Sequence, residues 1–425
     1  MNHVFVIDAA RRPLSMCHPA RARALLREGK AAVLRRYPFT IILAEALPEA
    51  VVKPLSVKVD PGAKETGLSL VDEQNRLLFA AVLTHRGNAI KEALTERRQY
   101  RRNRRARNTR YRPARFNHRT RPDGWLPPSL QHRVDTTLTW VNRFRRFALV
   151  DGLALERVKF DMQLMQNPEI SGVEYQQGEL QGYEVREYLL EKFNRTCCYG
   201  GETNVPLEIE HVVAKANGGS NRVSNLCLAC RPCNQKKGAQ RIEDFLAKKP
   251  ALLAKLKAQL KKPLASAAAV NATRNAILAA LCATGLPVET GSGAQTKFNR
   301  IRLGYPKAHW IDAACVGDSG ATVTLDPQTR PLLIKACGHG VRQRCRPDQY
   351  GFPRNPAPRA KKFAGYQTGD LVKANLPSGK FAGRHTGRIA IRHRPSFRLS
   401  TGDAVFDVHP KHLIKIHSAD GYAYR

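Results

Sequence analysis

The sequence predicts a multidomain α/β protein, and two observations support this fold class. The chain has 425 residues, a length that can bury more than one hydrophobic core without a disulfide framework. Apolar segments of strand length alternate with segments rich in helix formers along most of the chain. We find no internal repeat, so we expect several different domains rather than an array of similar ones.

The N-terminal part predicts strands separated by turns and basic segments. HVFVID and FTIILAEAL predict strands, and PARARALLREGKAAVLRR between them predicts a basic helix or two. From Leu55, LSVKVDPGAKETGLSLVDEQNRLLFAAVL places three apolar runs around turn-forming residues, which predicts three successive strands. LALERVKFDM, residues 153–162, predicts a further buried strand.

The C-terminal part predicts helices followed by short strands. Residues of about 242–285 are rich in helix formers, and YPKAHWIDAACVG predicts a helix that starts after a proline. Residues 365–425 place short apolar runs such as GRIAIRH and AVFDVH between the turns LPSGK and STGD. This spacing predicts a small β-barrel.

The charge of the chain indicates a nucleic-acid partner. It has 71 Lys and Arg against 35 Asp and Glu, a formal net charge of +36, which calls for a polyanion. Residues 97–121 hold twelve arginines, and the stretch before the first proline predicts a helix that is polar on every side. A disordered basic tail is the alternative, although such tails usually lie at chain termini.

We expect a cytoplasmic protein. No run approaches the roughly 18 apolar residues of a membrane span, and MNHVFVIDAARR has an apolar core too short for a signal peptide. The ten cysteines are then expected to be reduced. Their clustering in CLACRPC indicates metal binding rather than disulfides.

The segment EIEHVVAKANGGSNRVSNL carries the first candidate site. His211 can deprotonate a water molecule, and Glu210 with Asn234 can offer hard oxygen ligands to a divalent cation if the backbone bends or the cation sits at the strand edge. Asn225 would fix either the loop or the histidine ring. The order resembles the HNH nucleases, a ββα-metal family, and the resemblance implies one Mg²⁺ at this site. A surface loop with incidental polar residues is the alternative.

Cysteines flank this segment. Many HNH modules hold a structural zinc between two CxxC pairs, and here Cys230 and Cys233 form one pair while Gly200 stands where the second pair would end. Zn²⁺ held by Cys197, Cys230, Cys233 and a displaced fourth ligand such as Cys198 is one expectation. Thiols that only fill an apolar core are the other.

Three acidic residues far apart in sequence form the second candidate site. Asp60 ends the strand SVKVD, Glu156 sits in LALERVKF, and Asp312 follows His309 by about one helical turn. Singly, each would more often be a salt-bridged, capping or turn residue. Together they suit a site in which carboxylates hold two divalent cations, because a carboxylate in an apolar strand needs a cation or a partner.

This set resembles the RuvC-like nucleases of the RNase H fold, and the order of motifs along nearly the whole chain resembles the IscB family. That family comprises transposon-encoded, RNA-guided relatives of the large CRISPR effector nucleases. The resemblance rests on VKVDPGAKETGLSL, the arginine-rich stretch, LERVKFD, the inserted HNH motif and GYPKAHWIDAACVG. It implies an RNase H-like (RuvC) split core with an inserted ββα-metal HNH domain, an arginine-rich bridge helix and a C-terminal β-barrel. The implied domains are an N-terminal module (1–50), RuvC-like parts (51–90, 126–165 and 251–345), the bridge helix (91–125), the HNH domain (166–250) and the barrel (346–425).

The resemblance implies an RNA-guided DNA endonuclease of bacterial cytoplasm that binds one structured omega RNA and double-stranded target DNA. The HNH site would cut the RNA-paired strand and the RuvC-like site, with two Mg²⁺, the displaced strand. The barrel would read a short motif beside the target, and the bridge helix would bind RNA phosphates through Arg97, Arg98, Arg101, Arg102, Arg104, Arg105, Arg107 and Arg110. A protein-guided HNH endonuclease with an inactive RuvC-like scaffold, or a non-catalytic RNA-binding transposon protein, are the alternatives.

Overall fold

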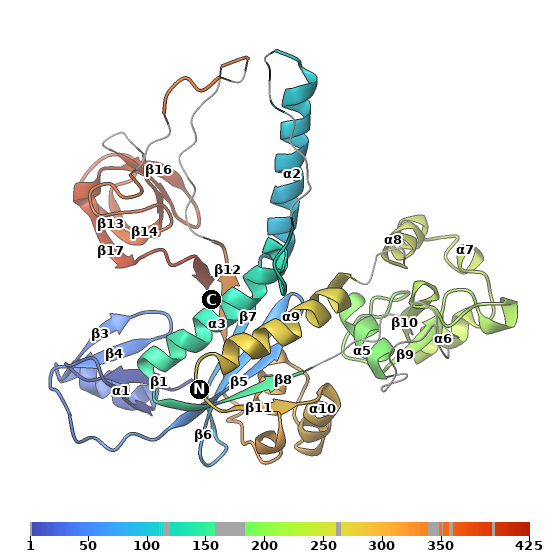
Figure 1. Ribbon diagram of the computed structural model, residues 1–425, viewed down its shortest axis with the longest axis horizontal. Helices are drawn as coiled ribbons and strands as arrows, with labels where there is room; N and C mark the ends of the chain where they lie inside the picture. Colours follow the sequence, from blue (N-terminus) through green and yellow to red (C-terminus); the bar gives the residue numbers. More distant parts are fainter. Residues whose placement is uncertain are drawn as a thin grey trace. The chain divides into compact units, whose positions relative to one another are not determined.

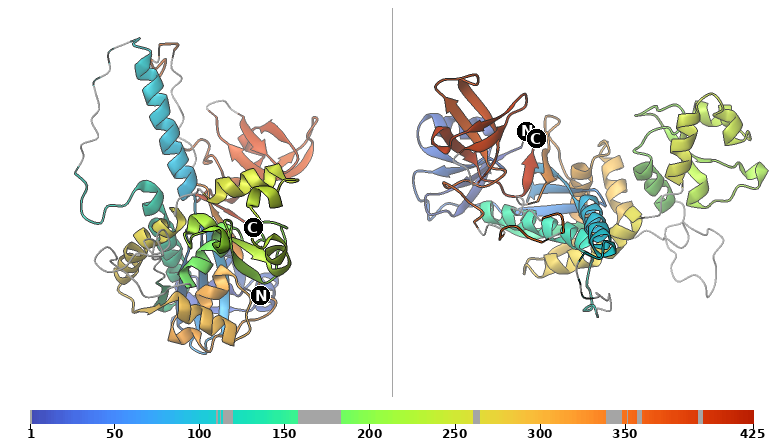
Figure 2. Two further views of the ribbon diagram at one scale, coloured as in Figure 1. Left: turned by 90° about the vertical axis from the view of Figure 1, so that its right-hand side faces the viewer. Right: turned by 90° about the horizontal axis from the view of Figure 1, so that it is seen from above.

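The computed structural model describes residues 2–109, 111, 113, 120–157, 183–260, 265–338, 348–350, 352–356, 360–392 and 396–425. The chain divides into two compact units (Figure 1 and Figure 2). Unit 1 comprises Met1–Arg157 and Asn275–Arg425, and unit 2 comprises Val158–Arg274. Unit 2 is therefore an insertion within the sequence of unit 1.

The N-terminal module of unit 1 is a four-stranded sheet in the order β2-β1-β4-β3. The strands predicted in HVFVID and FTIILAEAL are confirmed as β1 and β4. The prediction of helix is wrong for the second half of PARARALLREGKAAVLRR. Ala32 and Val33 there belong to an edge strand that pairs with β4. Its elements are β1 (Val4–Ile7), β2 (Pro13–Cys17), α1 (Pro19–Arg27), β3 (Ala31–Arg35) and β4 (Thr40–Leu43).

A seven-stranded sheet forms the centre of unit 1, in the order β11-β8-β5-β6-β7-β12-β18. The strands β5, β6 and β7 form an antiparallel meander, which confirms the three predicted strands, and β8 joins β5 in parallel. The strand predicted at 153–162 begins earlier, and its part from residue 158 on lies outside the described residues. The members are β5 (Leu55–Pro61), β6 (Glu65–Asp72), β7 (Leu77–Thr84), β8 (Val150–Glu156), β11 (Val288–Gly291), β12 (Leu332–Ala336) and β18 (Tyr422–Tyr424).

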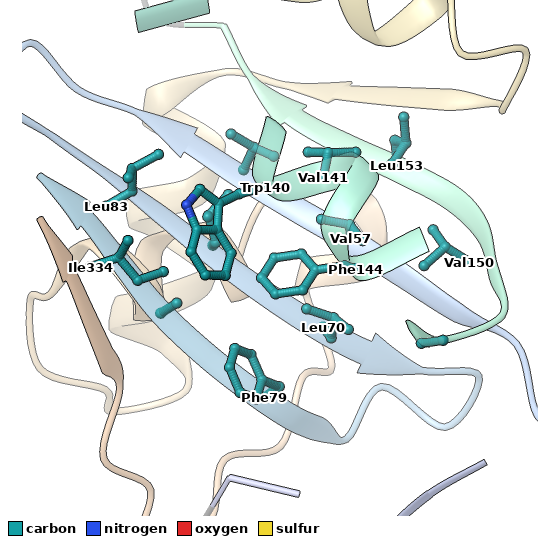
Figure 3. Packing of buried hydrophobic residues seen from close by; sticks show 14 of the residues in the cluster. Val57, Leu70, Phe79, Leu83, Trp140, Val141, Phe144, Val150, Leu153 and Ile334 are labelled. Carbon is teal, nitrogen blue, oxygen red and sulfur yellow. The ribbon is translucent and has the colours of Figure 1, made fainter. Parts of the chain in front are cut away.

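Helices cover both faces of this sheet. On one face, Trp140 and Phe144 of α3 (Pro128–Phe147) are fully buried in the same cluster as Val57 and Val59 of β5 (Figure 3). On the other face lies the short helix α11 (His309–Ala314), the helix predicted after the proline. Because side chains alternate along a strand, Lys58 and Asp60 face the α11 layer.

The first part of the arginine-rich stretch, residues 97–106, lies in the helix α2 (Gly87–Ala106), drawn in cyan in Figure 1. Its side chains are exposed from Glu92 to Arg104, as expected for a helix without an apolar stripe. Seven of the eight arginines predicted to bind RNA are described, and Arg110 lies outside the described residues.

The C-terminal residues of unit 1 form an antiparallel sheet in the order β16-β15-β14-β13-β17. The segments GRIAIRH and AVFDVH contribute strands to it, as predicted, whereas closure into a barrel stays a prediction. The last strand, β18, leaves this sheet and pairs with β12 of the central sheet. The strands are β13 (Leu371–Leu376), β14 (Gly383–Ala390), β15 (Phe397–Ser400), β16 (Val405–Val408) and β17 (Leu413–His417).

Unit 2 is built on a β-hairpin with helices around it. The helical stretch predicted at about 242–285 is present as three separate helices, α7, α8 and α9, the last of which runs from unit 2 into unit 1. The elements are α5 (Tyr183–Lys192), β9 (Leu207–His211), β10 (Leu226–Cys230), α6 (Arg231–Lys237), α7 (Ile242–Phe245), α8 (Pro250–Leu260) and α9 (Ala265–Cys282).

The chain leaves unit 1 and returns to it at neighbouring points. The Arg157 guanidinium donates to Oδ1 of Asn275 at 3.3 Å, and these two residues flank the insertion. Glu156 pairs with Gly291 where β8 and β11 run in parallel. Among the helices that the structure describes, none is long and apolar enough to cross a membrane.

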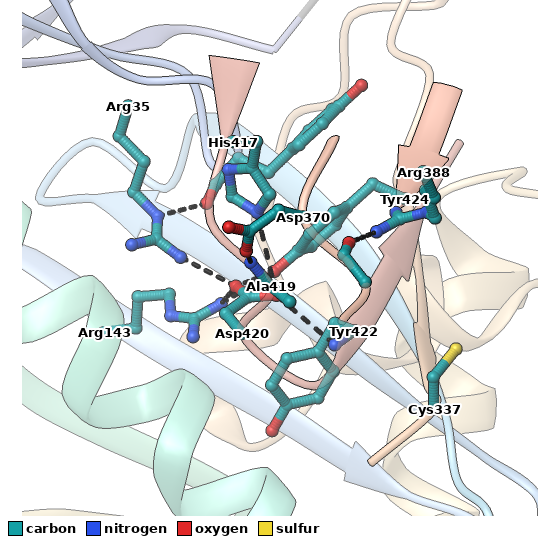
Figure 4. A network of polar contacts seen from close by, with 12 residues as sticks. Arg35, Arg143, Cys337, Asp370, Arg388, His417, Ala419, Asp420, Tyr422 and Tyr424 are labelled. Carbon is teal, nitrogen blue, oxygen red and sulfur yellow. Dashed lines mark hydrogen bonds and ion pairs between the residues drawn. The ribbon is translucent and has the colours of Figure 1, made fainter. Parts of the chain in front are cut away.

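A polar network joins the N-terminal module, α3 and the C-terminal strand (Figure 4). Oδ2 of Asp420 accepts hydrogen bonds from Arg35 at 2.8 Å, from Arg143 at 3.1 Å and from the Tyr424 hydroxyl. Burial raises the pKa of Asp420, but the nearby His417 imidazole, the hydrogen bond from Tyr424 and the charge of Arg143 more than offset this and lower the pKa to about 2.

We predict that Asp420→Asn destabilises unit 1 by about 2 kcal/mol at neutral pH, because the lowered pKa is a stability contribution. That contribution is fully present above about pH 4 and is lost as the pH falls towards 2. All three tryptophans, Trp125, Trp140 and Trp310, lie in unit 1, so urea unfolding followed by tryptophan fluorescence reports this unit. Asp403→Asn, an exposed acid, is the matched control and should behave as wild type. A wild-type acid dependence in Asp420→Asn would contradict this role for the network.

Candidate active sites

Two of the predicted acids meet because adjacent parallel strands carry them. In the ladder of β5 and β8, Lys58 pairs with Ala154 and Val59 with Leu155. The next position in this register brings Asp60 beside Glu156 at the ends of the two strands. Their carboxyl groups interact with each other, and each residue is 7% exposed.

The helix α11 brings the other two predicted residues to the same place. Nδ1 of His309 lies 2.9 Å from Oδ2 of Asp60, and Asp312, which is 3% exposed, interacts with both Asp60 and Glu156. The helix can approach the sheet this closely because Gly67 of β6 lies beneath it, where a Cβ atom would overlap the His309 carbonyl group. The structure thus brings all four sequence-predicted residues of this site together.

The proximity of these carboxyl groups controls their protonation. Burial and then the charge of Asp60 raise the pKa of Glu156 well above its ordinary value. Burial would also raise the pKa of Asp60, but the interaction with Glu156 and the hydrogen bond with His309 lower it to about 2. For His309, burial opposes protonation and the Asp60 hydrogen bond outweighs it, so the pKa of the imidazole is raised. The negative charge of Asp60 therefore opposes ionisation of Glu156, as expected for like charges in contact.

Two cations contact Asp312 that the sequence did not single out. Nε of Arg300, from α10 (Gly293–Arg302), lies 2.8 Å from Oδ1, and Nζ of Lys307 lies 3.1 Å from Oδ2. Arg300 is buried, whereas the Lys307 side chain is 31% exposed. The sequence could have indicated Lys307 as a member of this site, because it comes two residues before His309. It could not have indicated Arg300, which lies nine residues before His309 in another helix.

The donor set of this cluster suits divalent cations. Three buried carboxylates supply hard oxygen ligands, and their mutual repulsion is a free-energy cost that a cation relieves. Asp60, Glu156 and Asp312 could therefore hold Mg²⁺, provided that Lys307 moves from Oδ2 of Asp312 into solvent.

In unit 2, the second candidate site lies on the β9–β10 hairpin and α6. Both acids of β9 contact α6: Nδ2 of Asn234 donates to Oε2 of Glu208 at 2.7 Å, and Nζ of Lys237 lies 2.6 Å from Oε1 of Glu210. Glu210 and Lys237 are both buried. We predicted that Asn234 and Glu210 share a cation, but Asn234 contacts Glu208 and a fully buried ammonium group contacts Glu210. Glu208 is therefore a candidate ligand that the sequence motif did not indicate.

The histidine of this site is oriented by a loop residue. Nε2 of His211 lies 2.8 Å from Oδ1 of Asn221. Asn225 fixes the loop rather than the ring: its amide donates to the carbonyl oxygens of Val213 and Ser220, and its Oδ1 accepts from the Val213 N–H. Of the two roles left open for Asn225, the structure supports the first.

A third cluster contains the predicted cysteines. The ligand atoms of Cys197, Glu202, Cys230 and Cys233 all lie within 4.8 Å of one another. Three thiols and a carboxylate form a donor set that suits tetrahedral Zn²⁺. Burial and the neighbouring thiols raise the pKa of Cys233 to about 12, which a bound cation would reverse.

The fourth member of this cluster corrects the expectation that Cys198 could complete it. Consecutive side chains point apart, and Sγ of Cys198 lies 3.0 Å from Sγ of Cys227 while its N–H donates to the Leu228 carbonyl. Glu202 takes the fourth position instead, with Oε2 3.7 Å from Sγ of Cys230.

Comparison with known proteins gives two family matches. Residues 4–178 match a family described as RRXRR protein, and residues 196–250 match a family described as HNH endonuclease. Unit 2 is thus similar to HNH endonucleases, which supports a nuclease, and the two matches together fit a nuclease of the IscB and Cas9 type. No curated protein matches the sequence.

Among solved structures, this chain is similar to Cas9 proteins. A structure of Streptococcus thermophilus Cas9 in complex with the GGAA PAM matches with 12% identity and a TM-score of 0.23, over 62% of this chain and 32% of that chain. The type II-C Cas9 of Actinomyces naeslundii matches with 14% identity and a TM-score of 0.16, over 70% of this chain and 45% of that chain. The chain therefore spans about a third to a half of the length of these Cas9 structures.

We predict that the purified protein contains one Zn²⁺ per chain, measured by mass spectrometry of metals. Cys230→Ser should abolish the zinc content, and Glu202→Ala should lower the affinity because it removes one of four ligands. Cys198→Ser is the matched control, since Cys198 lies next to Cys197 but outside the cluster, and should retain full zinc. Loss of zinc in Cys198→Ser with retention in Glu202→Ala would contradict this ligand set.

Proposed function

We propose that this chain is an RNA-guided DNA endonuclease of the IscB type, with one nuclease site in each unit. The observation that carries the proposal is the convergence of Asp60, Glu156 and Asp312 from three distant segments in a chain whose insertion matches HNH endonucleases. Two sites in one chain suit a duplex substrate, because each strand then has its own site. The core of unit 1 would be the RuvC-like nuclease.

In unit 1, the three carboxylates would bind and orient the reacting groups. Asp60, Glu156 and Asp312 would hold Mg²⁺, which supplies charge stabilisation for the attacking and leaving oxygens of a phosphodiester. His309 is held on Asp60 with its imidazole biased to the charged form. It would present positive charge, or a proton, to the phosphate. Arg300 stabilises the side chain of Asp312 from the buried side.

In unit 2, His211 would act as the general base. Its contact with Asn221 leaves Nδ1 as the nitrogen available to accept a proton from water. Asn225 holds the intervening loop in place through hydrogen bonds to Val213 and Ser220. Glu208, Glu210 and Asn234 are the oxygen donors available to hold Mg²⁺ there.

The guide RNA is proposed from charge. The seven described arginines between Arg97 and Arg107 are accompanied by no acid in that stretch, and an exposed polyarginine helix binds phosphates without reading bases. The omega RNA, the target-adjacent motif and the cytoplasmic location are proposed from the family resemblance.

One observation favours a second candidate, a protein-guided HNH endonuclease whose unit 1 site is inactive. Both carboxylate oxygens of Asp312 are paired with cations, Arg300 and Lys307, as in an ordinary structural ion-pair cluster. That candidate would cut without RNA and would nick one strand only.

The first experiment is to purify the protein from cells that carry its native flanking DNA and to sequence the RNA that copurifies. One abundant structured RNA with a variable end supports guided cleavage. A mixture of unrelated cellular RNAs would favour the protein-guided candidate. The RNA identified in this way supplies the guide for the cleavage tests.

We predict that each site cuts one strand. In plasmid cleavage with strand-specific end labels, Asp60→Ala should abolish the nick in the displaced strand and His211→Ala the nick in the RNA-paired strand. Each loss should be at least 100-fold, the lower end of what removing a positioned catalytic group costs. The strand that each variant still cuts is the internal control, and Asp151→Ala, an exposed acid of β8, should cut both. Removal of Mg²⁺ should stop both reactions. If either variant left both nicks intact, that site assignment would be wrong.

We predict that replacing Arg97, Arg98 and Arg101 by Gln weakens binding of the copurified RNA and reduces its salt dependence. Each lost phosphate contact should reduce the slope of log K against log salt by about 0.7 to 0.9. Fluorescence anisotropy over a series of salt concentrations measures both effects. Replacing three exposed arginines of α1, Arg21, Arg23 and Arg27, removes the same charge elsewhere and is the control. Equal effects of the two triple substitutions would mean that α2 has no special role.

A further inference from the structure

Lys58 is a buried cation that the proposed chemistry of unit 1 does not use. It lies in β5 two residues before Asp60 and is 1% exposed. Burying an ammonium group costs free energy unless polar partners replace its hydration. Because residues two apart in a strand share a face, Lys58 and Asp60 both point into the layer that contains α11.

The Lys58 ammonium group binds the turn that follows α11. Nζ donates to the carbonyl oxygen of Val316 at 3.2 Å and to Oγ of Ser319 at 2.6 Å. The Ser319 hydroxyl donates in turn to Oε2 of Glu289, and the Ser319 N–H donates to Oε1 of the same carboxylate at 3.1 Å. A cation from β5 and an anion from β11 therefore meet on Ser319.

The same turn is held from α10. Nδ2 of Asn299, which is 4% exposed, donates to the carbonyl oxygens of Cys315 at 3.0 Å and Gly317 at 2.9 Å. The turn is thus bound by β5, by β11 and by α10. In the sheet, β5 and β11 are the two neighbours of β8, the strand that carries Glu156.

These contacts determine where α11 can lie. The helix has six residues and contributes both His309 and Asp312 to the carboxylate cluster. Its first residue is fixed by the contact of His309 with Asp60, and the turn after its last residue is fixed by Lys58. Without Lys58, the turn would lose two of its hydrogen bonds, and the C-terminal end of so short a helix could shift and move Asp312 relative to the other carboxylates.

We propose that Lys58 is a positioning residue for the carboxylate cluster of unit 1, acting through the turn after α11. The proposal rests on the proposed nuclease function of that cluster. Lys58 and Glu289 have opposite charges, so the network adds no net charge to the site, and its effect is on geometry. Residues behind a metal ligand typically contribute 10–100-fold to metal affinity or activity.

The test uses the full-length protein with its copurified RNA and Mn²⁺ as the probe metal. Calorimetric titration of wild type, Asp60→Ala and Lys58→Met identifies the binding event that belongs to the cluster as the one that Asp60→Ala removes. We expect Lys58→Met to weaken that event 10–100-fold and to raise by a similar factor the Mg²⁺ concentration needed to nick the displaced strand. Nicking of the RNA-paired strand should not change. Lys53→Met removes the same charge from an exposed position before β5 and is the control.

Wild-type Mn²⁺ binding and wild-type nicking in Lys58→Met would overturn the proposal. Should this variant fail to fold, as judged by tryptophan fluorescence, Ser319→Ala removes the hydroxyl partner alone and must show a weaker effect in the same direction, or the proposal is wrong. The proposed function fails separately, if wild type does not nick the displaced strand. In that case, weakening of the Asp60-dependent event by Lys58→Met would still support the positioning role.

Discussion

Three carboxylates confined to a buried corner of one sheet are the constraint on which the rest of unit 1 depends. The ladder of β5 and β8 brings Asp60 and Glu156 together, and the glycine beneath α11 lets Asp312 join them. Like charges in contact cannot all ionise in a poorly hydrated place. The surrounding contacts can be understood as responses to this one cost: the imidazole of His309 beside Asp60, and the cations Arg300 and Lys307 beside Asp312.

The same physical requirement recurs in unit 2 with other partners. Glu210 is neutralised by Lys237, and Glu208 accepts a hydrogen bond from Asn234. In both units, a divalent cation would have to replace a lysine ammonium group at a carboxylate oxygen. A bound divalent cation would thus displace an ammonium group that already compensates the carboxylate, rather than bind to an unpaired carboxylate. The thiol cluster differs, because a metal that binds there displaces protons from thiols rather than an ammonium group.

Sequence alone predicted the elements that periodicity encodes. The strands that end at Asp60 and Glu156 follow from short apolar runs between turns, so the meeting of these two acids could be expected. The contacts of Asp312 with Arg300 could not, because they depend on how two helices pack. The choice between Glu208 and Glu210 beside Asn234 likewise depends on the register of α6 against β9, which no residue pattern in the strand encodes. Glu202 was not predicted, because the spacing of cysteines does not indicate a carboxylate as the fourth ligand.

The closeness of Arg157 and Asn275 has a consequence for how such a chain can change over time. Because the two ends of the insertion lie side by side, Arg157 and Asn275 need only a short connection between them, and the part of α9 that belongs to unit 1 still provides the crossover from β8 to the parallel strand β11. A short linker could therefore replace the whole of unit 2 without moving either strand, and a different domain with adjacent termini could occupy the same place. The architecture accordingly permits unit 2 to be lost, gained or exchanged as a module while the central sheet is preserved.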